Sequence, residues 1–193
     1  MRKAKAKRAQ TSSRKTSRRK NGRRGTTGMP QEDLIQLILM DHKKIKPLLK
    51  ALKDTLLPMD ERWSMFEQFI PLFERHSRPE EYTLYNTMKE IKKLREEGFE
   101  GEVEHVLADQ MVDEAKRESD DDILSAKLKI LGELVEHHVQ EEERNLLPNF
   151  KKSVGQQERL SLGRKFIELK QQMGETFNQE QESRSEGEWA TSA

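Results

Sequence analysis

The sequence predicts an all-α fold, an antiparallel up-down four-helix bundle with a short fifth helix and disordered tails. Four long segments repeat apolar residues at helical spacing. Strand signals are missing, because no stretch alternates apolar and polar residues and no Asn-Gly or Asp-Gly turn joins two β-branched stretches. Short connections between long helices favour antiparallel neighbours, so a bundle is the expected arrangement.

The first helix is predicted over residues 34–57. Its apolar positions recur at helical spacing from Leu34 through Ile45 to Leu56. Pro58 is expected to stop this helix, because proline lacks the N–H that a helix interior needs.

The second helix is predicted to start with Asp60 as its N-cap and to run to about Leu94. Aromatic residues at helical spacing, including Phe66 and Phe73, mark its buried face. The stretch EEGFEGE is then expected to break the chain before the third helix.

The third helix is predicted to begin near Glu100, to last about twenty residues and to end in the acidic run ESDDD. Either Asp120 or Asp121 is expected to cap the fourth helix, which ends near the stretch NLLPNF. A weaker amphipathic segment follows over residues 159–173, and the polar tail begins at Glu175.

We therefore predict three parts: a disordered basic arm over 1–29, the bundle over 30–152, and a C-terminal helical segment with its tail over 153–193. The arm has five Lys and seven Arg in residues 1–28 and no acid. Such a charge binds polyanions through counterion release, so residues 2–24 are expected to bind nucleic acid without reading its sequence. The alternatives are a solubilising extension, or an arm that meets the acidic body of another copy.

The composition excludes several classes of protein. The chain has no cysteine, which rules out disulfides and thiolate metal sites and fits a cytoplasmic or nucleoid-associated protein. No segment is apolar enough to span a membrane, and the arm lacks the apolar part of a secretory signal. The arm is Arg- and Ser-rich like an organelle transit peptide, but it lacks an apolar face. No Ser/His/Asp or Gly-rich phosphate motif indicates a hydrolase or a nucleotide enzyme.

The five histidines all fall within the predicted helices, and four of them have an acid four residues later. On a helix this spacing puts both side chains on one face. The histidines are His42, His76, His105, His137 and His138, and the acids are Glu80, Asp109, Glu141 and Glu142.

All the histidines except His137 lie on the apolar rows, and Glu80 and Glu142 extend the same rows. His137 faces more to the side. Carboxylates buried without a partner are too costly, so a bound cation is the expected partner. Imidazole and carboxylate without sulfur suit iron, manganese or zinc. The alternative is that each histidine is a hydrogen-bonded core residue.

The order His, HxxxE, His, HxxxE, with one motif per helix, resembles the hemerythrin-like (HHE cation-binding) family. The stretches are LMDHKKI, HSRPEEYTLY, EHVLAD and HHVQEEERNLLP, within about residues 34–152. The resemblance implies two non-haem iron ions, with manganese or zinc less favoured, and O2 or peroxide as the ligand. It implies that Glu80 and Glu142 bridge the ions, with His42 and His76 on one and His105 and His138 on the other.

The chain departs from the oxygen-carrying members of that family at Asp109, where they have a further histidine. Asp109 either ligates iron or leaves a position to water, and both changes favour reaction over oxygen carriage. We therefore expect oxygen sensing, or peroxide breakdown by catalase-like or peroxidase-like activity. The alternatives are iron storage or sensing, and a metal-free helical module that acts through its charged surfaces and its arm.

Pro79 lies between His76 and Glu80, inside the predicted second helix. Proline removes a backbone donor and crowds the preceding turn, so it could tilt Glu80 toward a bridging position. The alternative is that the helix ends at Arg78, because a residue before proline avoids the helical region.

Overall fold

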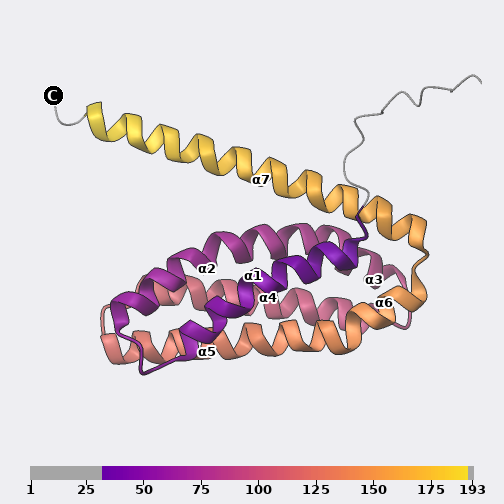
Figure 1. Ribbon diagram of the computed structural model, residues 1–193, viewed down its shortest axis with the longest axis horizontal. Helices are drawn as coiled ribbons and strands as arrows, with labels where there is room; N and C mark the ends of the chain where they lie inside the picture. Colours follow the sequence, from indigo (N-terminus) through magenta and orange to yellow (C-terminus); the bar gives the residue numbers. More distant parts are fainter. Residues whose placement is uncertain (1–31, 191–193) are drawn as a thin grey trace, which may run out of the picture.

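Four long helices lie side by side around the core, and a fifth crosses one side of them (Figure 1). The computed structural model describes the backbone of residues 32–190 and the side chains of residues 32–174. The bundle consists of α1 (Leu34–Lys53), α2 (Met59–Glu80), α4 (Arg95–Lys116) and α5 (Asp121–Glu141). The described residues contain no strand, and the all-α bundle predicted from the sequence is confirmed.

Two of the bundle helices continue into shorter elements. The π-helix η1 (Glu81–Tyr85) and α3 (Asn86–Glu90) follow α2, and the π-helix η2 (Glu142–Leu146) and α6 (Leu147–Ser153) follow α5. The second predicted helix therefore ends at Glu90 rather than near Leu94, since the backbone at Ile91 is extended.

The chain stays helical through Pro79, so the alternative that the second helix ends at Arg78 is wrong. Instead, α2 reaches Glu80 and then widens into the π turn of η1. The Pro79 carbonyl accepts a hydrogen bond from the Thr83 hydroxyl at 2.6 Å. A side chain thus supplies one hydrogen bond where the helix changes its width.

The first helix ends earlier than predicted, at Lys53 rather than residue 57. Asp54 adopts an extended conformation and its side chain accepts from the Leu56 N–H, which turns the chain outward. Leu56 is 93% exposed and does not belong to the core. The apolar periodicity runs past the true end of the helix because Leu56 keeps the spacing but not the burial.

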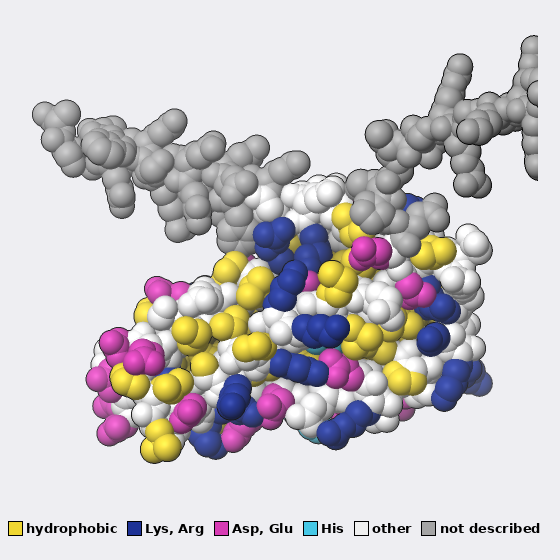
Figure 2. Space-filling view, viewed as in Figure 1, with side chains coloured by type: hydrophobic (Ala, Val, Ile, Leu, Met, Phe, Trp, Pro, Cys, Tyr) yellow, Lys and Arg dark blue, Asp and Glu magenta, His cyan; other side chains and the backbone are white. Residues whose placement is uncertain are grey.

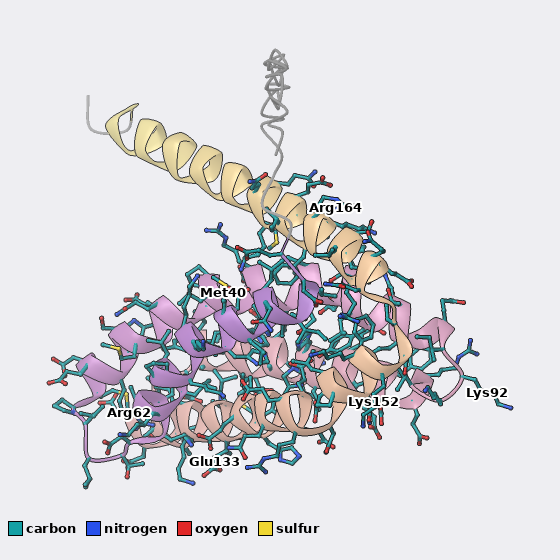
Figure 3. The ribbon with its side chains drawn as sticks, turned by 45° about the vertical axis from the view of Figure 1, so that its right-hand side comes forward. Met40, Arg62, Lys92, Glu133, Lys152 and Arg164 are labelled. Carbon is teal, nitrogen blue, oxygen red and sulfur yellow. The ribbon has the colours of Figure 1, made fainter. Side chains whose placement is uncertain are left out.

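The buried Arg62 side chain, labelled in Figure 3, closes this end of the bundle. It donates to the Leu52 carbonyl at 2.6 Å and to the Ser125 carbonyl at 2.9 Å. The last carbonyls of a helix lack partners within it, so this contact satisfies one of them at the end of α1. Pro58 occupies the N-cap position of α2, so the predicted N-cap at Asp60 is wrong. Asp120 caps α5, as one of the two predicted alternatives.

The glycines of EEGFEGE lie inside α4, which begins at Arg95 rather than near Glu100. A Cβ on Gly98 would lie 3.0 Å from the Met88 Cβ, and one on Gly101 would lie 2.5 Å from the Tyr85 ring. The predicted break is therefore wrong, because these glycines allow α4 to pack closely against η1 and α3.

Two groups of apolar side chains fill the bundle. The first apolar cluster includes Phe66, Phe73 and Leu131, and the second apolar cluster includes Leu84 and Phe150. Along α1, His42 lies between Ile38 of the second cluster and Ile45 of the first, and along the chain of α2 and η1, His76 and Glu80 lie between Phe73 of the first cluster and Leu84 of the second. The polar site is thus enclosed by apolar packing at both ends.

The fifth helix, α7 (Gln156–Ala190), is longer than the predicted segment over 159–173. It packs against α1, α2 and η1 and buries Phe166 in the second apolar cluster. Arg159 anchors its start through an ion pair with Asp33 at 2.8 Å. The predicted basic arm over 1–29 lies outside the described residues.

The surface of the bundle is charged. On the face shown in Figure 2, Lys and Arg side chains gather in the middle and Asp and Glu gather toward the left end. Within the described part of the chain, no helix is long and apolar enough to cross a membrane.

Replacing Gly163 by alanine should detach the start of α7 from the bundle. A Cβ at this position would lie 2.1 Å from the Glu32 carbonyl oxygen, and a backbone atom cannot move aside cheaply. We expect Gly163→Ala to lower the free energy of unfolding by about 1–3 kcal/mol in chemical denaturation. Gly155→Ala is the control, since its Cβ would meet nothing within 4 Å. Equal stability of both variants would contradict this account of the docking.

Candidate metal centre

Six buried side chains meet in the middle of the bundle, and every bundle helix supplies at least one of them. Each is at most 2% exposed. They are His42 on α1, His76 and Glu80 on α2, His105 on α4, His138 on α5 and Glu142 at the start of η2.

The four-residue spacing of each HxxxE motif brings its histidine and glutamate together. His76 Nε2 lies 3.3 Å from Glu80 Oε2, and His138 Nε2 lies 3.7 Å from Glu142 Oε2. Contacts between helices join these pairs to the single histidines: His42 Nε2 is 3.1 Å from Glu142 Oε2, and the Nε2 atoms of His105 and His138 are 3.1 Å apart. The spacing within each helix and the packing between helices thus bring these side chains together.

The six residues form two overlapping groups whose ligand atoms lie within 4.8 Å of one another. One group is His42, His76, Glu80 and Glu142, and the other is Glu80, His105 and His138. The structure therefore brings together six of the seven predicted site residues. Binding of an ion by them stays a prediction.

Several buried nitrogen and oxygen atoms of this cluster have no hydrogen-bond partner. They are His42 Nε2, both ring nitrogens of His76, both carboxyl oxygens of Glu80 and Glu142 Oε2. His42 Nε2 and Glu142 Oε2, and likewise His76 Nε2 and Glu80 Oε2, lie within ion-pair distance of each other, but their geometry is not that of a hydrogen bond. Buried polar atoms normally have a hydrogen-bond partner. A group of buried nitrogen and oxygen atoms without partners therefore indicates a ligand that these atoms can coordinate. A metal cation fits that requirement.

Burial and neighbouring charge set the protonation of the cluster. Burial raises the pKa of Glu80 well above its ordinary value, and the nearby Glu142 carboxylate adds to the effect. Burial also opposes ionisation of Glu142, but the imidazoles, His138 foremost, outweigh it and lower the pKa of Glu142. Burial and His42 lower the pKa of His76. Two carboxylates so close together therefore cannot both ionise easily unless a cation lies between them.

Three of the four cluster histidines hydrogen-bond to a carboxylate through their outward nitrogen, Nδ1, whereas His76 Nδ1 lies near Asp41 without a hydrogen bond. A carboxylate there holds the proton on Nδ1 and leaves the Nε2 lone pair directed inward, the usual support for a metal-binding histidine. The pairs are His42 with Glu143 (3.0 Å), His105 with Glu81 (3.1 Å), His138 with Glu104 (2.6 Å) and His76 with Asp41 (3.9 Å, an ion-pair distance only).

Two of these supporting acids directly follow the two glutamates of the cluster in the sequence. Glu81 and Glu143 come directly after Glu80 and Glu142, and each supports the single histidine of a neighbouring helix. Sequence reasoning missed Asp41 and Glu104, which directly precede His42 and His105. An acid next to each single histidine was the available signal.

The two π-helices begin at matching points of the two HxxxE motifs. η1 starts one residue after Glu80, and η2 starts at Glu142 itself. A π turn holds more residues than an α turn and is frequent at functional sites. Here the π turn changes the direction in which successive side chains point. Glu80 and Glu142 face the cluster, whereas the next residues, Glu81 and Glu143, contact histidines of other helices.

Tyr85 also reaches the cluster. Its hydroxyl donates to Glu142 Oε1 at 2.7 Å and lies 3.3 Å from His138 Nε2. Burial, reinforced by the Glu142 charge, raises the pKa of Tyr85, so the phenol keeps its proton at neutral pH.

Asp109 and His137 lie apart from this cluster. Asp109 pairs with Arg78 at the edge of the bundle and belongs to neither ligand group. His137 is exposed and pairs with Glu141. The four-residue spacing alone did not separate these two from the inward residues.

A family model described as the hemerythrin HHE cation binding domain matches residues 33–150. The matched stretch contains all six cluster residues and ends before α7. No match to a curated protein or to a solved structure was found.

Replacing Glu80 by methionine should leave the metal-free protein about as stable as the wild type, or more so. The change removes a fully buried carboxyl without hydrogen-bond partners and fills its space with apolar atoms. Stabilisation by Co²⁺ should be lost, because a cation stabilises only the fold that binds it. Urea denaturation with and without Co²⁺ measures both effects.

Leu84, one turn further along the same buried row, provides the control for this experiment. Leu84→Ala should cost about 2–5 kcal/mol and keep the stabilisation by Co²⁺. If metal-free Glu80→Met lost several kcal/mol, the carboxyl would serve the fold instead of a cation.

Removing Glu143 should weaken metal binding, because His42 would lose the acceptor that orients it. We expect Glu143→Ala to lower Co²⁺ affinity about 10- to 100-fold in a spectroscopic titration. Glu136→Ala is the matched control: Glu136 also pairs with a lysine of α1, Lys53, as Glu143 does with Lys46, but it is not a cluster partner. Similar affinities for the two variants would argue against the supporting role.

Proposed function

Because this chain belongs to the hemerythrin HHE cation-binding domain family, we propose that its buried cluster binds two iron ions and reacts with O2 or peroxide. The observation that carries the proposal is the convergence of four imidazoles and two carboxylates at which buried ligand atoms lack hydrogen-bond partners. A hydrogen-bonded apolar core would not leave these atoms unpaired.

The two ligand groups suggest how the residues would share the ions. His42 and His76 would hold one ion, and His105 and His138 the other. Glu80 belongs to both groups, and Glu142 contacts His42 and His138, one histidine from each pair. Both glutamates are therefore proposed as bridging carboxylates.

The donor atoms are compatible with iron. The cluster offers only imidazole nitrogen and carboxylate oxygen, and the chain has no cysteine. Such donors suit iron and also manganese or zinc, of which zinc lacks redox chemistry. Bound iron would supply the electron exchange with O2 or peroxide that the side chains lack.

The surroundings of the cluster favour reaction over reversible oxygen carriage. Asp109, which replaces the additional histidine of the oxygen carriers, pairs with Arg78, so it would not supply the ligand that this histidine supplies in the carriers. The Tyr85 hydroxyl donates a hydrogen bond to Glu142 Oε1 beside the cluster. Iron with fewer imidazole ligands than in the oxygen carriers would favour reaction with O2 or peroxide over simple storage of O2.

The test is the iron content of the full chain after anaerobic reconstitution with Fe²⁺, followed by visible spectra in air, with azide and with peroxide. We expect two irons per chain and an absorption of coupled ferric ions that azide and peroxide change. A Glu80→Met control should lose most of the iron.

Other outcomes would contradict the proposal. Intact release of O2 on lowering the oxygen pressure would indicate a carrier. Iron released reversibly, with a matching change in stability, would favour iron storage or sensing. Absence of iron after reconstitution would favour a metal-free helical module.

A further inference from the structure

A third group of candidate ligands lies at the surface, outside the buried cluster. It consists of Glu104 on α4 and of His137 and Glu141 on α5, with ligand atoms within 4.8 Å of one another. Glu104 is partly buried, whereas His137 and Glu141 are exposed. The surface group therefore combines one imidazole with two carboxylates at a position open to solvent.

The surface group is the outward counterpart of the second HxxxE motif. In the stretch HHVQEE, His137 and Glu141 form one pair with four-residue spacing, and His138 and Glu142 form the same pair one residue later. A step of one residue turns the side chain by about 100° around a helix. One pair consequently faces solvent while the other faces the buried cluster.

A cavity reaches residues of both the surface group and the buried cluster, although His137 itself does not line it. Its volume is about 830 Å³, and its walls include Glu104 and Glu141 of the surface group together with His138 and Glu142 of the buried cluster. Glu142 contributes to the wall of the cavity, and its Oε2 is buried without a hydrogen-bond partner. The cavity therefore reaches a residue of the buried cluster that has an oxygen available for a cation.

Glu104 links the surface group to the buried cluster. It is a member of the surface group, and its Oε2 also lies 2.6 Å from His138 Nδ1. A cation bound at the surface group would therefore contact the same carboxylate, Glu104, that hydrogen-bonds to His138 of the buried cluster. An ordinary exposed His–Glu pair has no such link.

The charge of the cavity favours a cation. Its walls carry six glutamates against one lysine and one arginine. A cleft lined mainly by one sign of charge concentrates ions of the opposite sign and raises their rate of arrival. Because the surface group offers three protein ligands at most and is open to water, it should bind such an ion weakly and release it readily.

We propose that Glu104, His137 and Glu141 form a transient divalent-cation site at which ferrous iron is captured before it passes through the cavity to the buried cluster. This inference rests on the proposed function, since it assigns the route by which that cluster is loaded.

The test measures the rate at which the metal-free full chain takes up Co²⁺, followed by the absorption of the bound ion. Co²⁺ serves as the probe because it reports on its ligands without oxygen chemistry. The double variant His137→Ala/Glu141→Gln removes two surface ligands and leaves the six cluster residues intact. We expect uptake at least about tenfold slower than in the wild type, with the same final amount of bound cobalt.

Glu133→Gln is the matched control. It removes one negative charge from the same helix, as the double variant does, but Glu133 pairs with Lys129 and does not line the cavity. Figure 3 shows Glu133 on the outside of α5, well away from Lys92 at the cavity wall. Uptake by Glu133→Gln should match the wild type.

The possible results separate this inference from the proposed function. Equal uptake rates for the double variant and the wild type, with full final cobalt, would overturn the loading site alone. A lower final amount with an unchanged rate would also overturn it, because the surface residues would then belong to the final site. Absence of cobalt uptake by the wild type would overturn both proposals.

Discussion

The constraint on which this structure depends is the burial of two carboxyl groups among four imidazoles. Glu80 and Glu142 are almost fully buried, and three of their four oxygens lack hydrogen-bond partners. An apolar interior tolerates such groups only when a partner compensates for the water they lose. The two apolar clusters at either end exclude water from the site, which would strengthen the interaction of these carboxyl groups with a cation bound there.

The surroundings of the cluster are organised to direct the imidazoles inward. The acids that support their outward nitrogens come from positions directly beside the ligands, on different helices. Each helix, or the π-helix that continues it, therefore places an acid beside a histidine of the next helix around the bundle, so that the orientation of each histidine depends on how the helices pack. Removal of a supporting acid would therefore change the orientation of a cluster histidine without altering that histidine itself.

The last helix extends this network beyond the part of the chain that the family model matches. Lys170 of α7 pairs with Asp41, the acid that faces His76. Arg75, next to His76, contacts the Lys170 carbonyl at 3.5 Å. α7 therefore covers the bundle at the level of the cluster and holds one of its supporting acids in place.

The sequence by itself determined the helical fold and the six inward residues of the cluster. Both follow from spacing along single helices: apolar rows mark the buried face, and a histidine or glutamate on that row must point into the core. The same logic failed where a spacing continued without its packing. Leu56 kept the apolar period beyond the end of α1, and Asp109 kept the four-residue spacing while it paired with Arg78.

Only the tertiary structure decided the rest. The π turns after Glu80 and Glu142, the supporting roles of Asp41 and Glu104, the approach of Tyr85 and the position of α7 all depend on how the helices are rotated and how closely they pack. The glycines of EEGFEGE illustrate the reason: read along the chain they indicate a break, but in three dimensions they make room for Tyr85 and Met88. Periodicity fixes which face of a helix is buried, whereas contacts between helices fix what that face meets.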